Sequence, residues 1–238
     1  MAEELCKTVD PAPDMRVLDV ACGSGSGALI ASRRYCEAVG IDYVPALIRR
    51  AVLRADAEGY DAEFMVADAQ DLPFPENAFD AVISIFGVQF APDQQKAANE
   101  MLRVCRPGGI IGLASPVPDG WTGDFFKAHS RKVPPHPGVQ PAFKWGTAEA
   151  LEEMLGHGVK SIRCEDRVNF GYYRSVPHAV EVFSTYFGPT LTVLNTLLPE
   201  ERPEFLEELK TIFERYNRAT DTTAKIETKY MLSIAECR

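Results

Sequence analysis

The feature that most constrains the fold is a glycine-rich turn between an apolar strand and a helical pattern, in residues 17–27. Such a turn lets backbone N–H groups approach a ligand closely. The segment from Gly23 through Gly25 to Ala28 satisfies the dinucleotide fingerprint, and Asp42 lies where a ribose-binding acid belongs. The pattern alone therefore leaves a dinucleotide site, another ligand site and a plain tight turn open.

Asp19 distinguishes between the two kinds of ligand. A carboxylate at the entrance of the turn would repel a pyrophosphate, whereas it favours a ligand with a cationic group, such as the ammonium and sulfonium of S-adenosyl-L-methionine (SAM). Asp19 is also suited to a purely structural role, in which it accepts hydrogen bonds from the amides of the glycine turn. Both roles are compatible with the same position.

Short apolar runs alternate with helical patterns up to Ala114, which predicts βαβ units and a parallel sheet with right-handed crossovers. We expect a cap at Asp93 and a stop at Gly59 for two of the helices. The predicted strands are 15–20, 39–42, 62–66, 79–86 and 110–114, and the predicted helices are 28–38, 45–58 and 93–105, the last ended by Arg106-Pro107-Gly108-Gly109.

The alternating pattern of strands and helices ends after Ala114. Residues 116–141 are proline-rich and show no period, so an irregular insert is predicted there. Further elements are then predicted as helices at 147–155, 177–187 and around Phe205–Tyr216, and strands at 161–170 and 225–235.

Composition excludes several classes. Lys+Arg 25 against Asp+Glu 34 gives a net charge of −9, which argues against a nucleic-acid partner. The longest nearly apolar stretch, Ala81–Ala91, is too short to cross a bilayer. The residues at the start, Met1–Glu4, lack the basic region of a signal peptide, so a cytoplasmic protein is predicted.

Cysteines and histidines do not form a metal-binding pattern. The six cysteines contain no CxxC pair, which predicts reduced thiols. We predict no metal site and expect each histidine to be a surface or loop residue rather than a base. The histidines are His129, His136, His157 and His178.

An ordered series of motifs lies between residues 15 and 114. One glycine loop is a weak signal, but several motifs in order, each at a strand end or a turn, are specific. They are residues 17–25, Gly40-Ile41-Asp42, Ala67-Asp68-Ala69, Leu72-Pro73-Phe74 with Phe79-Asp80, and residues 102–109.

The series resembles the class I SAM-dependent methyltransferases of the type-11 group and is similar to the quinone-biosynthesis C-methyltransferases. The resemblance implies an α/β, Rossmann-like fold with seven mostly parallel strands, an antiparallel last strand and an inserted cap. It implies an enzyme that transfers a methyl group from SAM by in-line displacement to a small, partly apolar acceptor, leaving S-adenosyl-L-homocysteine (SAH). A single domain is expected over 1–238, with a core at about 15–114, 147–170 and 221–238 and cap insertions at about 115–146 and 171–220.

The resemblance also implies a cofactor site at the strand ends. Asp42 would accept hydrogen bonds from both ribose hydroxyls, and Tyr43 would pack on adenine. The other implied contacts are Asp19 with the backbone of Ala21, Gly23 and Gly25 for the methionine part, Asp68 and the Ala69 amide for adenine, and the Ile85 backbone for the methionine ammonium.

For the acceptor pocket we predict Gln89, Trp145 and Tyr173, from three separate segments. The aromatic residues between 170 and 187 either form the roof of this pocket or pack inside the cap. Gln89 and Phe90 stand where some relatives carry histidines, so no general base is identified. The segment that precedes the first predicted strand is also shorter than is usual in the family.

Two other functions are compatible with the sequence. One is a non-catalytic protein that binds SAM, and the other is a nicotinamide-dependent oxidoreductase. The acceptor is expected to be a small molecule, and the protein a monomer or a homodimer.

Overall fold

The computed structural model describes residues 1–134 and 139–238, so His136 lies outside the described residues. The chain forms two compact units. The first unit contains Met1–Ser115, Gln140–Asp166 and Met231–Arg238, and the second contains Pro116–Val139 and Arg167–Tyr230. No helix in the described residues is long and apolar enough to span a membrane.

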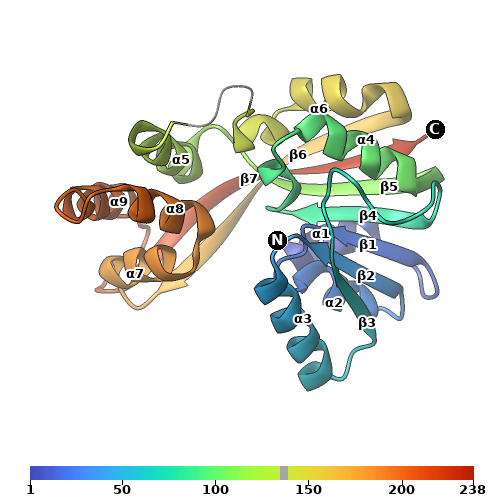
Figure 1. Cartoon of the computed structure of the whole chain (residues 1–238), viewed down its shortest axis with the longest axis horizontal. Coiled ribbons are helices and arrows are strands. Elements are labelled where there is room, and N and C mark those ends of the chain that lie inside the picture. Colours follow the sequence, from blue (N-terminus) through green and yellow to red (C-terminus); the bar gives the residue numbers. More distant parts are fainter. Residues whose placement is uncertain (135–138) are drawn as a thin grey trace. The chain divides into compact units, whose positions relative to one another are not determined.

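A mixed seven-stranded sheet has the order β3-β2-β1-β4-β5-β7-β6. Strand β7, the last strand in the sequence, is antiparallel, which confirms the predicted fold class. Figure 1 shows β3, β2, β1, β4 and β5 side by side in this order. The strands are β1 (Arg16–Val20), β2 (Glu37–Asp42), β3 (Ala62–Val66), β4 (Phe79–Ile85), β5 (Cys105–Pro116), β6 (Val159–Tyr173) and β7 (Ala224–Cys237).

The helices of the first unit pack on the sheet and on one another. Helix α2 contacts β1 and β2, α3 contacts β2 and β3, and α4 contacts both β4 and α6. Pro45 starts α3 and Gly59 ends it at φ 70°, while the Asp93 side chain accepts from the Lys96 amide at the start of α4, as predicted. The helical segments are α1 (Ala2–Val9), α2 (Ser26–Ser32), α3 (Pro45–Glu58), η1 (Val88–Phe90), α4 (Gln94–Val104), η2 (Ala142–Gly146), α6 (Ala148–Leu155) and η3 (Gly156–Gly158).

The register brings the functional strand ends together. Strands β1, β2 and β4 are parallel neighbours, with Asp19 paired to Gly40 on one side and to Ile83 on the other. The carboxyl ends of parallel strands meet at one edge of a sheet, and ligands of open α/β sheets bind there. Asp42 is the last residue of β2 and Ile85 the last of β4, so both lie at this edge.

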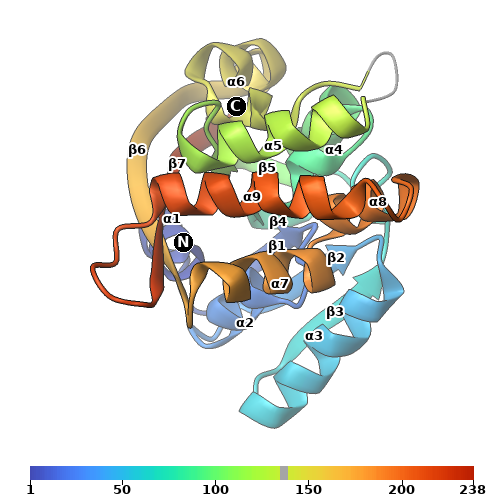
Figure 2. The ribbon, with the colours of Figure 1, turned by 90° about the vertical axis from the view of Figure 1, so that its left-hand side faces the viewer.

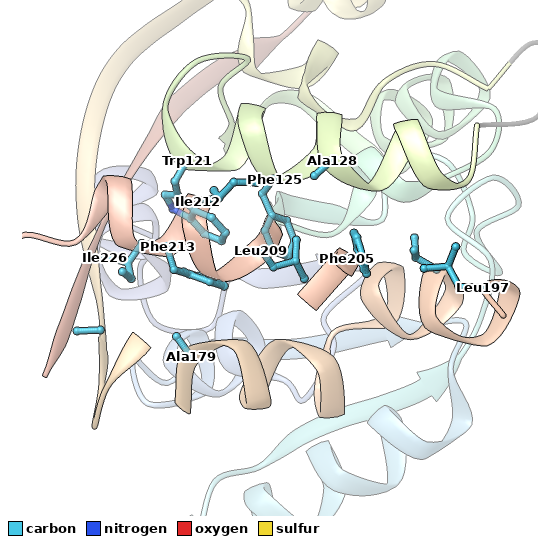
Figure 3. Packing of buried hydrophobic residues seen from close by; sticks show 12 residues of the cluster. Trp121, Phe125, Ala128, Ala179, Leu197, Phe205, Leu209, Ile212, Phe213 and Ile226 are labelled. Carbon is cyan, nitrogen blue, oxygen red and sulfur yellow. The ribbon is translucent and has the colours of Figure 1, made fainter. Parts of the chain in front are cut away.

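The second unit has an aromatic core of its own. Helices α5 and α7 both pack against α9, and Figure 2 shows α9 between them. Trp121, Phe125, Phe205 and Phe213 are buried in its centre (Figure 3), and the indole N–H of Trp121 donates to Thr228 Oγ1 at 2.7 Å. Its helices are α5 (Gly120–Lys132), α7 (Val176–Tyr186), α8 (Gly188–Thr196) and α9 (Arg202–Tyr216).

The structure differs from the prediction at two predicted elements and adds two helices to the second unit. Helix α2 ends at Ser32 rather than near Ala38, because Tyr35 turns the chain at φ 64° and β2 then begins at Glu37. Helices α5 and α8 were not predicted. The segment Arg106–Gly109 does follow the end of α4, but it is an irregularity inside β5, where pairing passes from Phe79–Cys105 to Ala81–Ile110.

Candidate functional site

A cavity of about 280 Å³ opens at the carboxyl ends of the strands in the first unit. Its walls come from the last two residues of β2 and from residues that follow β1, β2, β3 and β4, the place where the fold class predicts a ligand. The lining residues are Ala21, Ile41, Asp42, Tyr43, Ala67, Asp68, Ala69, Gln70, Gly87, Val88, Phe90, Ala91 and Pro92.

Asp42 connects the cavity with the glycine turn. Only 5% of its surface is exposed, and its Oδ2 accepts from the Gly23 amide at 2.9 Å while its Oδ1 accepts from the Val44 amide at 2.9 Å. A carboxylate offers about four acceptor positions, so these two bonds leave acceptor capacity on both oxygens. Asp42 therefore holds the turn in place and presents a carboxylate to the cavity.

The backbone at this edge is tightly constrained. Ala21 adopts φ 55°, a conformation uncommon for a residue with a side chain. A Cβ on Gly87 would lie 2.4 Å from the Ala21 carbonyl oxygen, so only glycine fits where the segment after β4 crosses the end of β1. Strained backbone of this kind concentrates at functional sites, and here both residues line the cavity.

Asp19 lies beneath the turn and is 1% exposed. Its Oδ2 accepts from the Ala28 amide at 2.9 Å, whereas its Oδ1 has no hydrogen-bond partner among the described residues. Burial raises the pKa of Asp19 to about 7, and the charge of Asp42 adds to this, against the lowering effect of the Ala28 and Gly27 amides. A Cβ on Gly27 would lie 2.6 Å from Asp19 Oδ2, so this close approach requires glycine.

Tyr43 and Asp68 form the exposed side of the cavity. The Tyr43 side chain is 72% exposed. Asp68 Oδ1 accepts from the Gln70 amide at 2.8 Å, and this bond, with the bonds from the Gln70 side chain, holds the pKa of Asp68 below its ordinary value. Asp68 is therefore ionised and already oriented near neutral pH.

The structure brings together only part of the predicted cofactor set. Ala21, Asp42, Tyr43, Asp68 and Ala69 line the cavity. Four other predicted residues do not line it, although Gly23 is bonded to Asp42 and Asp19 lies below the turn. These four are Asp19, Gly23, Gly25 and Ile85.

The sequence analysis did not assign to the cofactor site the residues after β4 that line the cavity. They are Gly87, Val88, Phe90, Ala91 and Pro92. The signal was available, because these residues follow β4 and the ends of parallel strands share one edge.

The predicted acceptor residues occupy different places. Gln89 is 2% exposed and Trp145 is fully buried in the first unit, where their segments η1 and η2 are in contact. Neither residue lines the cavity. Tyr173 belongs to the second unit, where it packs beside Phe183 and Phe213.

The aromatic residues between 170 and 187 divide into two groups. Phe183 and Phe187 pack against the core of the second unit, which is the internal packing considered above. Tyr172 and Tyr186 are 72% and 75% exposed. The aromatic residues between 170 and 187 therefore do not share a single role.

One histidine differs from the expectation of a surface or loop position. His129 is 5% exposed within α5, with Nδ1 bonded to the Phe125 carbonyl and Nε2 to Thr190 Oγ1. Burial lowers the pKa of His129. Among the residues that the structure describes, no group of three or more His, Cys, Asp or Glu side chains is placed to hold a metal ion.

Comparison with known proteins identifies the family. A family model described as a methyltransferase domain matches residues 18–113. An uncharacterized protein of Mycobacterium tuberculosis is 33% identical over 258 residues, covering 100% of this chain and 90% of the relative. A demethylmenaquinone methyltransferase of Thermus thermophilus is 34% identical over 172 residues, covering 71% of this chain and 67% of the relative. The chain belongs to the class I SAM-dependent methyltransferases.

A solved structure agrees with this methyltransferase in its fold. The crystal structure of a putative methyltransferase from Bacillus halodurans aligns with a TM-score of 0.66 at 18% identity, covering 99% of this chain and 97% of that chain. The family membership favours SAM over a nicotinamide cofactor, which agrees with the argument from Asp19.

Proposed function

We propose that this methyltransferase transfers a methyl group from SAM to a small, partly apolar acceptor, with the adenosine part of SAM in the cavity. The observation that carries the proposal is the cavity lining, in which the buried Asp42 carboxylate stands beside the exposed ring of Tyr43. Asp42 accepts from the ribose hydroxyls, Tyr43 packs on adenine, and Asp68 with the Ala69 amide reads the edge of the ring. The residues present fit the cofactor.

The methionine part is assigned to the glycine turn. Asp19 Oδ1 is a buried acceptor without a partner among the described residues, and a ligand ammonium would supply the missing charge and hydrogen bonds. The Ile85 backbone lies at the end of β4 and takes the other side of the ammonium. Gly23 and Gly25 allow the backbone to approach the ligand closely.

SAM supplies an activated methyl group whose positive charge disappears on transfer. The protein therefore contributes alignment and exclusion of water, and a general base is not required for a nucleophile that arrives ionised. The acidic net charge of −9 supports a small molecule rather than nucleic acid as acceptor. The name of the Thermus thermophilus relative makes demethylmenaquinone the first acceptor to assay.

The direct test is incubation of the protein with SAM labelled in its methyl group, first with demethylmenaquinone and then with fractions of a bacterial extract. We expect one low-molecular-weight product to gain the labelled methyl group, together with release of SAH. In parallel, SAM and SAH should raise the melting temperature and NAD should not. SAH binding without transfer to any fraction would favour a non-catalytic binding protein, and stabilisation by NAD alone would overturn the assignment.

The proposal predicts that SAH affinity depends on pH through Asp19. With its pKa raised to about 7, Asp19 is mostly protonated at about pH 6 and mostly ionised at about pH 8. A ligand ammonium binds the ionised form, so affinity should increase about tenfold from about pH 6 to about pH 8. Calorimetric titrations of SAH across this range measure it.

The matched control for this prediction is Asp19→Asn, which keeps the shape but does not titrate. Its SAH affinity should be weaker at high pH and nearly constant across the range. A wild-type profile as flat as that of Asp19→Asn would show that Asp19 does not face the ammonium.

A further inference from the structure

Helix α3 carries an arginine that reaches across to the glycine turn. Arg54 Nη1 donates to the Ser24 carbonyl at 2.8 Å, and lies 3.3 Å from both Ser24 Oγ and Ser26 Oγ. Its Nη2 donates to Glu58 Oε1 at 3.4 Å, one helical turn further along α3. One nitrogen of the guanidinium is thus directed to the turn while the other is held by the helix to which it belongs.

These bonds complete the support of the turn from two sides. On the cavity side, Asp42 Oδ2 accepts from the Gly23 amide at 2.9 Å. On the other side, Arg54 binds the carbonyl of the Ser24–Gly25 peptide, whose N–H donates to the Cys22 carbonyl at 2.9 Å. Because both ends of this peptide are bonded, its plane cannot rotate without breaking a hydrogen bond.

The turn needs such support because its own residues are permissive. Gly23 and Gly25 adopt φ 57° and φ 82°, and glycine loses more conformational entropy on ordering than any other residue. A hydrogen bond from a guanidinium to a carbonyl is charge-assisted and stronger than a neutral one. Arg54 also presents several donors in a fixed plane, which a lysine cannot do.

We propose that Arg54 is a positioning residue for cofactor binding, which fixes the glycine turn and so sets the affinity for SAM and SAH. The inference rests on the proposed function, in which the turn contacts the methionine part of the cofactor. Arg54 does not line the cavity, so it acts through the turn and not by contact with the ligand. Its effect belongs to cofactor binding and not to the transfer step.

The test is the dissociation constant of SAH, measured by calorimetry with no acceptor present. Arg54→Met keeps the aliphatic stem and removes the donors, so SAH affinity should fall about tenfold. Arg50→Met removes an exposed arginine one turn earlier on the same helix, and its affinity should stay within about twofold of wild type.

Three further readouts separate positioning from general stability. Arg54→Lys should recover part of the affinity, since the charge remains but the planar fork is lost. Amide hydrogen exchange in residues 22–26 should be faster in Arg54→Met than in Arg50→Met in the absence of ligand. With the full chain, the methyl-transfer rate of Arg54→Met at saturating SAM should be close to that of the wild type.

Equal SAH affinity in Arg54→Met and Arg50→Met overturns the proposal, as does a lower melting temperature of Arg54→Met with unchanged affinity. No SAH binding by the wild-type protein would instead defeat the proposed function. The exchange of the turn amides would still decide in that case whether Arg54 holds the turn, because it requires no ligand.

Discussion

Replacing Asp42 with alanine should weaken SAM and SAH binding by about 2–4 kcal/mol, or about 30-fold to 1,000-fold in the dissociation constant. Two effects combine in this loss. The cavity loses the carboxylate proposed to accept from the ribose hydroxyls, and the Gly23 and Val44 amides lose their acceptor at 2.9 Å. Calorimetric titration with SAH measures the total without any knowledge of the acceptor.

Asp80→Ala is the matched control. Asp80 is also an aspartate that holds a backbone amide, that of Arg16 at 2.8 Å, but it lies at the amino end of β4, away from the cavity edge. Its removal should leave SAH affinity within about twofold. Asp42→Asn keeps one side-chain oxygen as an acceptor but removes the negative charge. Its SAH affinity should therefore lie between those of Asp42→Ala and the wild type. Equal affinity in Asp42→Ala and Asp80→Ala would exclude Asp42 from the cofactor site.

Much of the first unit was predictable because its signals are local. The strand β3 was predicted with its observed bounds, and α3 with its proline start and glycine stop. The alternation of strands and helices, read with the family resemblance, gave the sheet and its antiparallel last strand. These features depend on periodicity, caps and turns that lie within a few residues of one another.

The elements that were missed depend on tertiary contacts. Residues 116–141 are proline-rich and show no helical period, so an irregular insert and not a helix was predicted there. In the structure residues 120–132 form α5, because Trp121, Phe125 and Ala128 pack into the aromatic core with residues of α9. That burial requires residues about 80 positions away, such as Phe205 and Phe213, and no local pattern indicates it.

In the candidate site, too, some residues could be predicted from the sequence pattern and others depend on tertiary contacts. Asp42 ends a strand, while Tyr43, Asp68 and Ala69 follow strands. These residues could be predicted to meet, because the ends of parallel strands share an edge. The role of Arg54 depends on a side chain that crosses from α3 to the turn. The spacing between Ser24 and Arg54 in the sequence does not indicate this contact. Trp145 was predicted to line the acceptor pocket as one of three residues from separate segments, and its full burial could only come from the structure.

The burial of Trp145 changes what its removal should do. Trp145 is 0% exposed and sits in η2, which contacts η1, and η1 supplies Val88 and Phe90 to the cavity. Trp145→Ala should therefore lower the free energy of unfolding by about 3–5 kcal/mol through the cavity left in the first unit. We also expect SAH affinity to fall with it, in contrast to a residue that contacts only the acceptor. Urea unfolding and SAH titration measure the two effects.

Trp145→Phe separates packing from hydrogen bonding. The Trp145 indole N–H has no hydrogen-bond partner among the described residues, so phenylalanine loses volume but no protein hydrogen bond. Its cost should be about 1–3 kcal/mol. The control is Trp121→Phe, which loses both volume and the 2.7 Å bond to Thr228, and should cost about 1 kcal/mol more. If Trp145→Phe instead keeps the stability and SAH affinity of the wild type but loses transfer to an identified acceptor, the indole N–H binds the acceptor and the packing role is wrong.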